Sequence, residues 1–167
     1  MAKNVLGAVG FALLAAMLQS TLLRRLAVYH AVPDLVLVIM VFSAYNNGTM
    51  TGQLTGFFSG FMLDCLSGAP LGLNMFIRTL IGALAGLIKG AFYLDAIFLP
   101  MFLCAGATGL KALLLSGLHL LFTQGVPAYR FDAPMVWVEM AFNTFSAPFI
   151  FAFLKLFKSL LIGERKI

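Results

Sequence analysis

Charge is the scarcest property of this sequence. Charged residues make up 10% of its 167 residues, whereas an ordinary soluble domain has about 25%. Hydrophobic residues make up 62% and lie in long runs that short polar stretches interrupt. A transmembrane helix needs about 20 mainly apolar residues with few charges. The composition therefore excludes a soluble domain and predicts an all-α polytopic membrane protein, with a single transmembrane domain over residues 1–167.

Cysteine and catalytic motifs are also scarce. The two cysteines, Cys65 and Cys104, lie in different apolar segments without a CxxC spacing, so neither a disulfide framework nor a zinc site is predicted. Both are expected to be small core residues. No serine or cysteine has a nearby base and acid in sequence, and the HExxH and GxxxxGK[ST] motifs are missing. The sequence therefore predicts no enzyme, no metal site and no cofactor.

The apolar runs predict about six transmembrane helices, over residues 4–23, 33–45, 52–66, 73–89, 96–122 and 135–161. The second has only about a dozen apolar residues, which at 1.5 Å each cover about half to two-thirds of a ~30 Å hydrocarbon core. The third is short as well. These two segments form either a re-entrant hairpin or two short spans that protein surrounds.

Basic residues favour an even number of crossings with both termini in the cytoplasm, because cytoplasmic loops carry an excess of lysine and arginine. The residues that fit this orientation are Lys3, Lys89, Lys155, Lys158, Arg165 and Lys166, and those that oppose it are Arg24, Arg25 and Arg130. The net charge of +5 comes largely from the C-terminal tail. Its expected partner is phospholipid, since no basic patch interleaved with aromatic residues indicates nucleic acid.

Small residues recur at every fourth position in three segments. They are Gly48, Gly52, Gly56 and Gly60 in the third, Gly82, Gly86 and Gly90 in the fourth, and Ala8, Ala12 and Ala16 in the first. Residues four apart share a helix face, and small residues there let two helices approach closely in lipid. Each stripe either packs against a helix of the same chain or binds a partner or ligand. Three stripes are more than a self-contained bundle of six helices requires.

Polar side chains inside apolar segments are costly unless paired, so they mark candidate sites. They are Gln19, Asp64, Arg78, Lys111, Glu139 and Asn143. Asp64 and Arg78 have comparable depths on the two glycine-bearing segments, so a salt bridge between them is expected, with a substrate or partner contact as the alternative. Lys111 overlaps in depth with Glu139 and Asn143, and a contact with either would satisfy its ammonium group. Gln19 is expected to hydrogen-bond across helices.

Several short motifs resemble those of the rod shape-determining protein MreD family. They are Gln19-Ser-Thr-Leu22, then Pro33-Asp34-Leu35, then a glycine-rich segment that ends in Asp64-x-x-Ser67-Gly68-x-x-x-Gly72. The resemblance covers roughly residues 15–90, and beyond them the number of spans and the length agree. It implies a scaffold in the bacterial cytoplasmic (inner) membrane, within the machinery that elongates the cell and organises peptidoglycan synthesis.

The same resemblance implies partners and a fold. The implied partner is the bitopic protein MreC and, through it, MreB, RodA and a class B penicillin-binding transpeptidase; a homodimer is left open. The fold is expected to be similar to that of the substrate-binding subunits of energy-coupling-factor vitamin transporters. Such subunits dock through an alanine stripe on their first helix, so a vitamin-uptake subunit is the alternative function. The short outer loops favour the scaffold, because ligand sites need a concave pocket with several polar groups.

Overall fold

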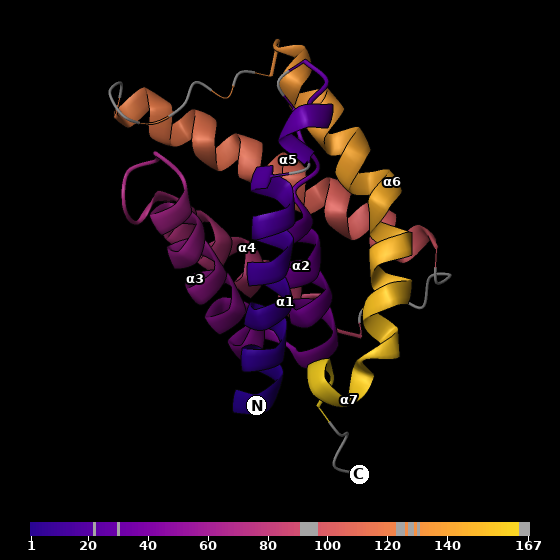
Figure 1. Ribbon diagram of the computed structural model, residues 1–167. Coiled ribbons are helices and arrows are strands. Elements are labelled where there is room, and N and C mark those ends of the chain that lie inside the picture. The colour runs from indigo at the N-terminus through magenta and orange to yellow at the C-terminus, as the bar shows by residue number, and fades with distance from the viewer. Residues whose placement is uncertain are drawn as a thin grey trace.

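The computed structural model describes residues 1–21, 23–29, 31–90, 97–122, 126, 129 and 131–163. The helices are α1 (Ala2–Thr21), the 3-10 helix η1 (Leu23–Leu26), α2 (Leu35–Asn47), α3 (Thr49–Leu66), α4 (Leu73–Leu87), α5 (Phe98–Leu121), α6 (Pro134–Leu156) and α7 (Lys158–Leu161) (Figure 1). Three of them, α1, α5 and α6, are long and apolar enough to cross a membrane. Arg130, Arg165, Lys166 and the side chain of Arg24, which bear on the predicted orientation, lie outside the described residues.

The six predicted segments coincide with α1 to α6, except that the last prediction, one helix over 135–161, was wrong. α6 ends at Leu156, and the chain turns at Phe157 into the separate helix α7. The Phe157 ring packs against Phe11 of α1 and Phe153, with centroid separations of 5.1 and 5.4 Å. The turn at Phe157 allows α7 to pack against α1.

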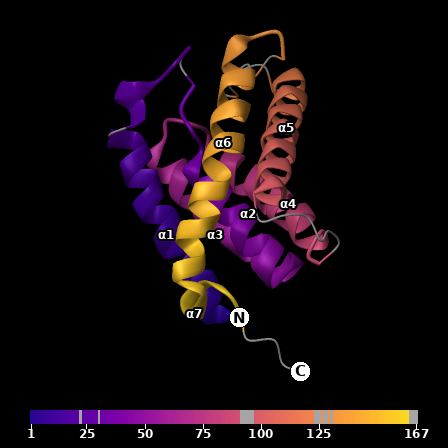
Figure 2. The same cartoon turned by 90° about the vertical axis from the view of Figure 1, so that its right-hand side faces the viewer.

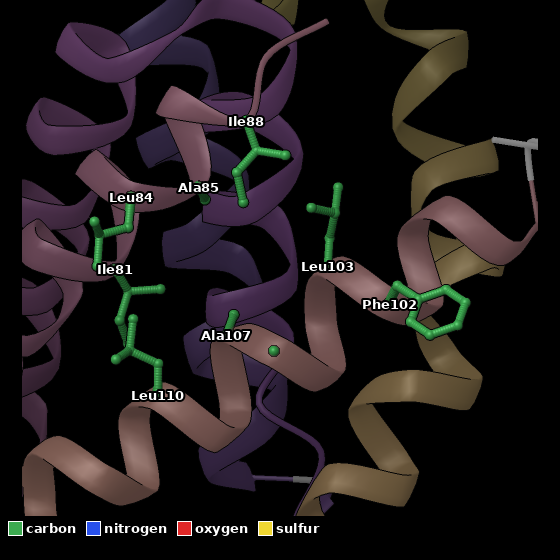
Figure 3. Close-up of a pocket in the computed structure, with 9 residues that line it drawn as sticks. Ile81, Leu84, Ala85, Ile88, Phe102, Leu103, Ala107 and Leu110 are labelled. Atoms are coloured by element: carbon green, nitrogen blue, oxygen red, sulfur yellow. The ribbon is translucent and has the colours of Figure 1, made fainter. Parts of the chain in front are cut away.

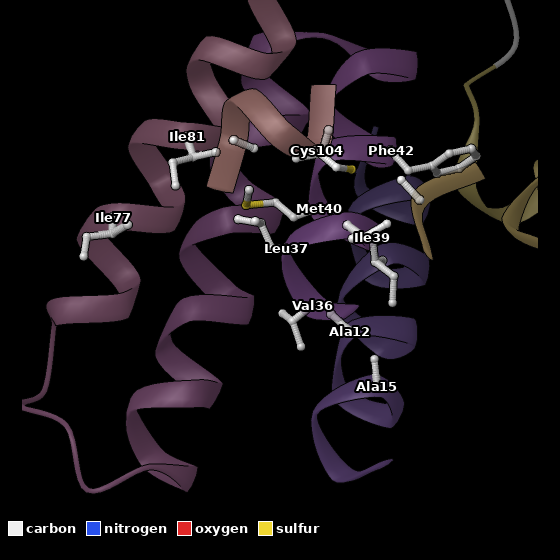
Figure 4. Packing of buried hydrophobic residues seen from close by; sticks show 14 of the residues in the cluster. Ala12, Ala15, Val36, Leu37, Ile39, Met40, Phe42, Ile77, Ile81 and Cys104 are labelled. Carbon is white, nitrogen blue, oxygen red and sulfur yellow. The ribbon is translucent and has the colours of Figure 1, made fainter. Parts of the chain in front are cut away.

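α2 is the central helix, and its neighbours are α1, α3, α4, α5 and α6. Every residue from Val36 to Ala44 is buried, as expected for a helix that is apolar on all sides. Residues of α1, α4 and α5 surround it, including Ala12, Ile81 and Cys104 (Figure 4). The short second segment therefore fits the alternative of a short helix that protein surrounds.

α3 and α4 form a hairpin in which the two backbones touch. A Cβ atom on Gly52 or Gly56 would overlap the carbonyl oxygen of Gly82 or Arg78, respectively. Gly60 and Gly86 also lie directly against the backbone of the opposite helix. Both glycine stripes therefore pack against each other inside the chain.

Two glycines of the predicted stripes have another role. Gly48 and Gly90 have φ angles of +98° and +73°, in the left-handed region that side-chain-bearing residues rarely adopt. Gly48 separates α2 from α3, and Gly90 follows α4. The assignment of Gly90 to a helix-packing stripe was wrong, because it shapes a turn outside the helices and has open space around it. Gly48 also shapes a turn, but its backbone lies directly against Gly86, so it still belongs to the contact between the two stripes.

The alanine stripe of α1 is also internal. Ala8, Ala12 and Ala16 are buried, and α1 packs against α2 and α3. All three small-residue stripes are thus closed within this chain, contrary to the expectation that one would remain for a partner. Cys104 is buried as predicted, whereas Cys65 is exposed on α3, so its assignment to the core was wrong.

One asparagine joins three segments at the end of the bundle where α1 begins. Asn47 Oδ1 accepts hydrogen bonds from Asn4 Nδ2 at 2.9 Å and from the backbone N–H of Gly163 at 2.8 Å. Asn47 Nδ2 donates to the Leu161 carbonyl at 2.7 Å. The start of α1 and the end of α7 therefore lie together (Figure 2).

The α5–α6 pair lies side by side in Figure 2 and stands partly apart from the other helices. An apolar groove of about 240 Å³ lies between α4 and α5, and its lining includes Ile81, Ile88 and Phe102 (Figure 3). A second, of about 270 Å³, lies between α1 and α6, with Leu35 and Ile39 of α2 in its lining.

Candidate functional site

Asp34 is the centre of a buried ion cluster. Arg78 Nη2 donates to both carboxylate oxygens of Asp34, at 2.8 and 2.6 Å. Lys111 Nζ donates to Asp34 Oδ2 at 2.8 Å and to Glu139 Oε1 at 2.6 Å. Two acids and two bases make the cluster neutral overall.

The position of Asp34 follows from the start of α2. Its Oδ1 atom caps the helix by accepting the backbone N–H of Leu37 at 3.0 Å, as an N-cap aspartate does. The Asp34 backbone N–H donates to Asn143 Oδ1 at 2.7 Å, and Asn143 Nδ2 donates to Thr108 Oγ1 at 2.9 Å. One residue thereby connects α2 to α4, α5 and α6.

The cluster is almost closed to its surroundings. Asp34, Arg78 and Glu139 are each no more than 4% exposed, and the side chain of Lys111 is 15% exposed. The Lys111 ammonium lies 5.7 Å from the centre of the Tyr129 ring. A single charge at the centre of a membrane helix costs about 2.5–3.5 kcal/mol, so mutual pairing is what makes four of them tolerable here.

The predicted Asp64–Arg78 salt bridge was wrong. Asp64 accepts four hydrogen bonds at the start of α4: from the backbone N–H groups of Gly72, Asn74 and Met75 and from Asn74 Nδ2, at 2.9–3.1 Å. The first N–H groups of a helix have no partner within it, and Asp64 supplies one. Arg78 lies about a turn deeper along α4 and extends to Asp34 instead.

The motif that ends in Gly72 therefore builds a turn. Gly72 has a left-handed φ of +98° and precedes α4, and the Ser67 Oγ accepts the N–H of Ala69 at 3.4 Å. Gly68 lies in the same turn, with open space around it. Asp64, Ser67, Gly68 and Gly72 together fix how α3 reverses into α4.

The other polar predictions had mixed outcomes. Lys111 contacts Glu139, as one of the two alternatives predicted, and Asn143 instead binds Asp34 and Thr108. Gln19 makes no contact with the ion cluster among the described residues. Its Oε1 atom is buried without a hydrogen-bond partner there. Asp34 was predicted only as part of a motif. Its signal was an acidic residue directly before a wholly apolar helix.

Comparison with known families gives the context for this cluster. The sequence matches rod shape-determining protein MreD over residues 3–157. The chain belongs to the MreD family. The match confirms the resemblance found in the first half of the chain and extends it over α5 and α6, so every residue of the ion cluster lies inside the MreD region. No curated protein and no solved structure matched significantly. As an MreD family member, the chain is an integral membrane protein associated with determination of rod shape.

Proposed function

We propose that this chain is an inner-membrane scaffold of the cell-elongation machinery that binds an MreC-like bitopic protein. Through it, the scaffold acts with MreB, RodA and a class B penicillin-binding transpeptidase in peptidoglycan synthesis. The observation that carries the proposal is the MreD match over residues 3–157. The proposed topology has six spans, α1 to α6, with both termini in the cytoplasm.

The distribution of charge supports this topology. Asn47 and its contacts place the start of α1 and the end of α7 together. Lys3 lies in the first turn of α1, Lys155 and Lys158 lie where α6 meets α7, and the Lys89 side chain reaches Gly48 at the same end. Arg25 follows α1 at the opposite end. The excess of lysine at one end is the pattern of cytoplasmic segments.

The interior supports a scaffold over a vitamin-uptake subunit. The alanine stripe on which the transporter alternative depended is buried against α2 and α3, so it offers no docking surface in this conformation. The ion cluster pairs its charges with each other inside the bundle. Partners would therefore contact the lipid-facing sides of the helices, and the similarity to transporter subunits would concern the fold alone.

Depletion of the protein in its host tests this proposal. We expect rod-shaped cells to become round, vitamin uptake to remain unchanged, and a single-span MreC-like protein to co-purify with the tagged chain in mild detergent. The variant Gly10→Ala, at an exposed position with free space, should restore rod shape as well as the wild type does. Normal shape combined with a growth requirement for one vitamin would transfer the assignment to the uptake subunit.

A further inference from the structure

A large cavity lies at the end of the bundle where α1 begins. It has a volume of about 590 Å³, and its lining comes from the start of α1, the end of α2, the start of α3 and the residues that follow α4 and α7. Ligand pockets in proteins have volumes of about 300–1,000 Å³. The cavity therefore has room for an organic molecule or a lipid head group rather than for a bare ion alone.

Positive charge gathers at this cavity. α3 begins here, and the first N–H groups of a helix have no partner within it and form the positive end of its dipole. Gly48, the residue before α3, has no side chain to cap them. The Lys89 Nζ atom lies 4.0 Å from the position that a Cβ atom on Gly48 would take. The described lining contains no aspartate or glutamate, so an anion is the group that these charges lack.

The end of α4 explains the position of Lys89 only in part. A helix C-terminus favours a nearby cation, and Lys89 follows α4 directly. This contact gives the N–H groups at the start of α3 no acceptor. Among the described residues, Lys89 forms no salt bridge. Its ammonium group is therefore available to a ligand in the cavity.

A buried hydroxyl also indicates a ligand. Thr51 lines the cavity, is only 4% exposed, and its hydroxyl has no hydrogen-bond partner among the described residues. Most buried polar groups in folded proteins are paired. Asn46, also in the lining, donates one amide hydrogen to the Phe42 carbonyl at 2.8 Å and keeps the other. An ammonium, backbone N–H groups at a helix start and neutral donors are the set that binds phosphate.

One wall of the cavity is fixed by Asn47. Its Nδ2 atom donates to the carbonyls of Ser43 and Leu161 at 3.0 and 2.7 Å, and its Oδ1 atom accepts from Asn4 and Gly163. These bonds hold the ends of three helices together without a ligand. The donors of the cavity therefore need little reorganisation on binding, which favours affinity.

The remaining lining suits an organic body, because it includes Tyr45, Met50 and Ile162. We propose that the cavity binds a phosphate ester, either a soluble one or the head group of an anionic phospholipid. The phosphate lies beside Lys89 and Thr51, and the rest of the molecule contacts the apolar side chains. In the proposed topology this end of the bundle is cytoplasmic. The inference goes beyond the proposed function and requires no protein partner.

Two substitutions test the site in the purified full chain. Lys89→Met removes the charge from an exposed side chain, and Thr51→Val removes the hydroxyl and keeps the shape. Glycerol 3-phosphate, titrated at constant ionic strength, should raise the melting temperature of the wild type, because it binds the folded state. We expect Lys89→Met to weaken this binding about tenfold and Thr51→Val about threefold. Lys158→Met, the same change at an exposed residue outside the lining, should leave it unchanged.

Native mass spectrometry identifies a lipid source of the phosphate. The chain is released from micelles that contain equal amounts of phosphatidylglycerol and phosphatidylcholine. If the ligand is a lipid head group, phosphatidylglycerol should remain on the wild type and on Lys158→Met and be lost from Lys89→Met. Without ligand, Lys89→Met and Thr51→Val should melt close to the wild-type temperature, because neither group has a partner among the described residues. This control separates lost binding from lost folding.

Two results would overturn the inference. The first is an equal loss of binding in Lys89→Met and Lys158→Met, because general attraction between a basic surface and anions would then explain it. The second is a wild type that responds to neither glycerol 3-phosphate nor phosphatidylglycerol. Both would leave the scaffold proposal intact, since that depends on a co-purifying bitopic protein. A chain that binds the phosphate ester but no bitopic protein would show the reverse.

Discussion

The α3–α4 hairpin and the junction that holds α5 and α6 are built in opposite ways. In the hairpin, the glycines bring backbone directly against backbone along most of the two helices. At the junction, Arg78 and Lys111 bind Asp34 and Lys111 also binds Glu139, while one apolar groove lies between α4 and α5 and another between α1 and α6. Lipid provides no hydrophobic drive for helix association, so packing and polar bonds must replace it. The hairpin distributes its attraction over many weak contacts, whereas the junction concentrates it in a few strong ones.

The largest effect is expected at the junction. Asp34→Asn leaves Lys111 paired with Glu139 but removes the carboxylate that binds Arg78, so a buried guanidinium loses its ion pair. Removing one partner of a buried ion pair costs about 3–5 kcal/mol, a large part of a typical stability of about 5–15 kcal/mol. We expect low abundance in the membrane and a strongly reduced melting temperature in detergent.

A second variant controls for the loss of the carboxylate itself. Asp34→Asn combined with Arg78→Met removes one charge of each sign and leaves the Lys111–Glu139 pair intact. It should recover part of the lost stability. If Asp34→Asn alone melts at the temperature of the wild type, the cluster does not hold the junction.

The hairpin should respond to a single methyl group. Gly56→Ala places a Cβ atom into the Arg78 carbonyl, and because this neighbour is backbone we expect the upper end of the about 1–3 kcal/mol cost of overpacking, which exceeds the gain of about 1 kcal/mol in helix propensity. The matched control is Gly10→Ala, where the Cβ atom meets open space and a small gain is expected. Thermal unfolding of the purified variants measures both. Equal melting temperatures would show that α3 and α4 can separate freely.

The smallest effect is expected at the turn between α3 and α4. Asp64→Ala removes the acceptor for three backbone N–H groups at the start of α4, which should lower the free energy of unfolding by about 1–2 kcal/mol. Amide hydrogen exchange should accelerate in residues 72–75. Exchanging Asp64 and Arg78 should lower the stability more than changing either residue alone, because the two side chains have different partners. If the exchange instead restored stability, the two residues would form the salt bridge that the sequence predicted.

The helices could be predicted because lipid imposes long apolar runs, and the facing glycines because a spacing of four fixes one helix face. The Lys111–Glu139 contact was predicted as well, because the position of each residue along its helix indicates its depth in the membrane. Depth does not determine which way a side chain points, and for this reason Arg78 was assigned to Asp64. Asp34 lies 44 residues from Arg78 and 77 from Lys111, and no local pattern specifies contacts at that distance. The turn at Phe157 depends on Phe11 of α1, which is equally remote.

The long separations around Asp34 give the folding of this protein an order in time. Ribosomes add about 5–20 residues per second, so roughly 2 to 9 s pass between synthesis of Asp34 and of Arg78, and longer until Lys111 follows. During that interval the Asp34 carboxylate has neither of its cations. α2 therefore cannot settle in its final place as it emerges and must wait, near water or within the insertion machinery, for helices that do not yet exist. We therefore expect the most buried helix of the finished protein to be among the last to become stable.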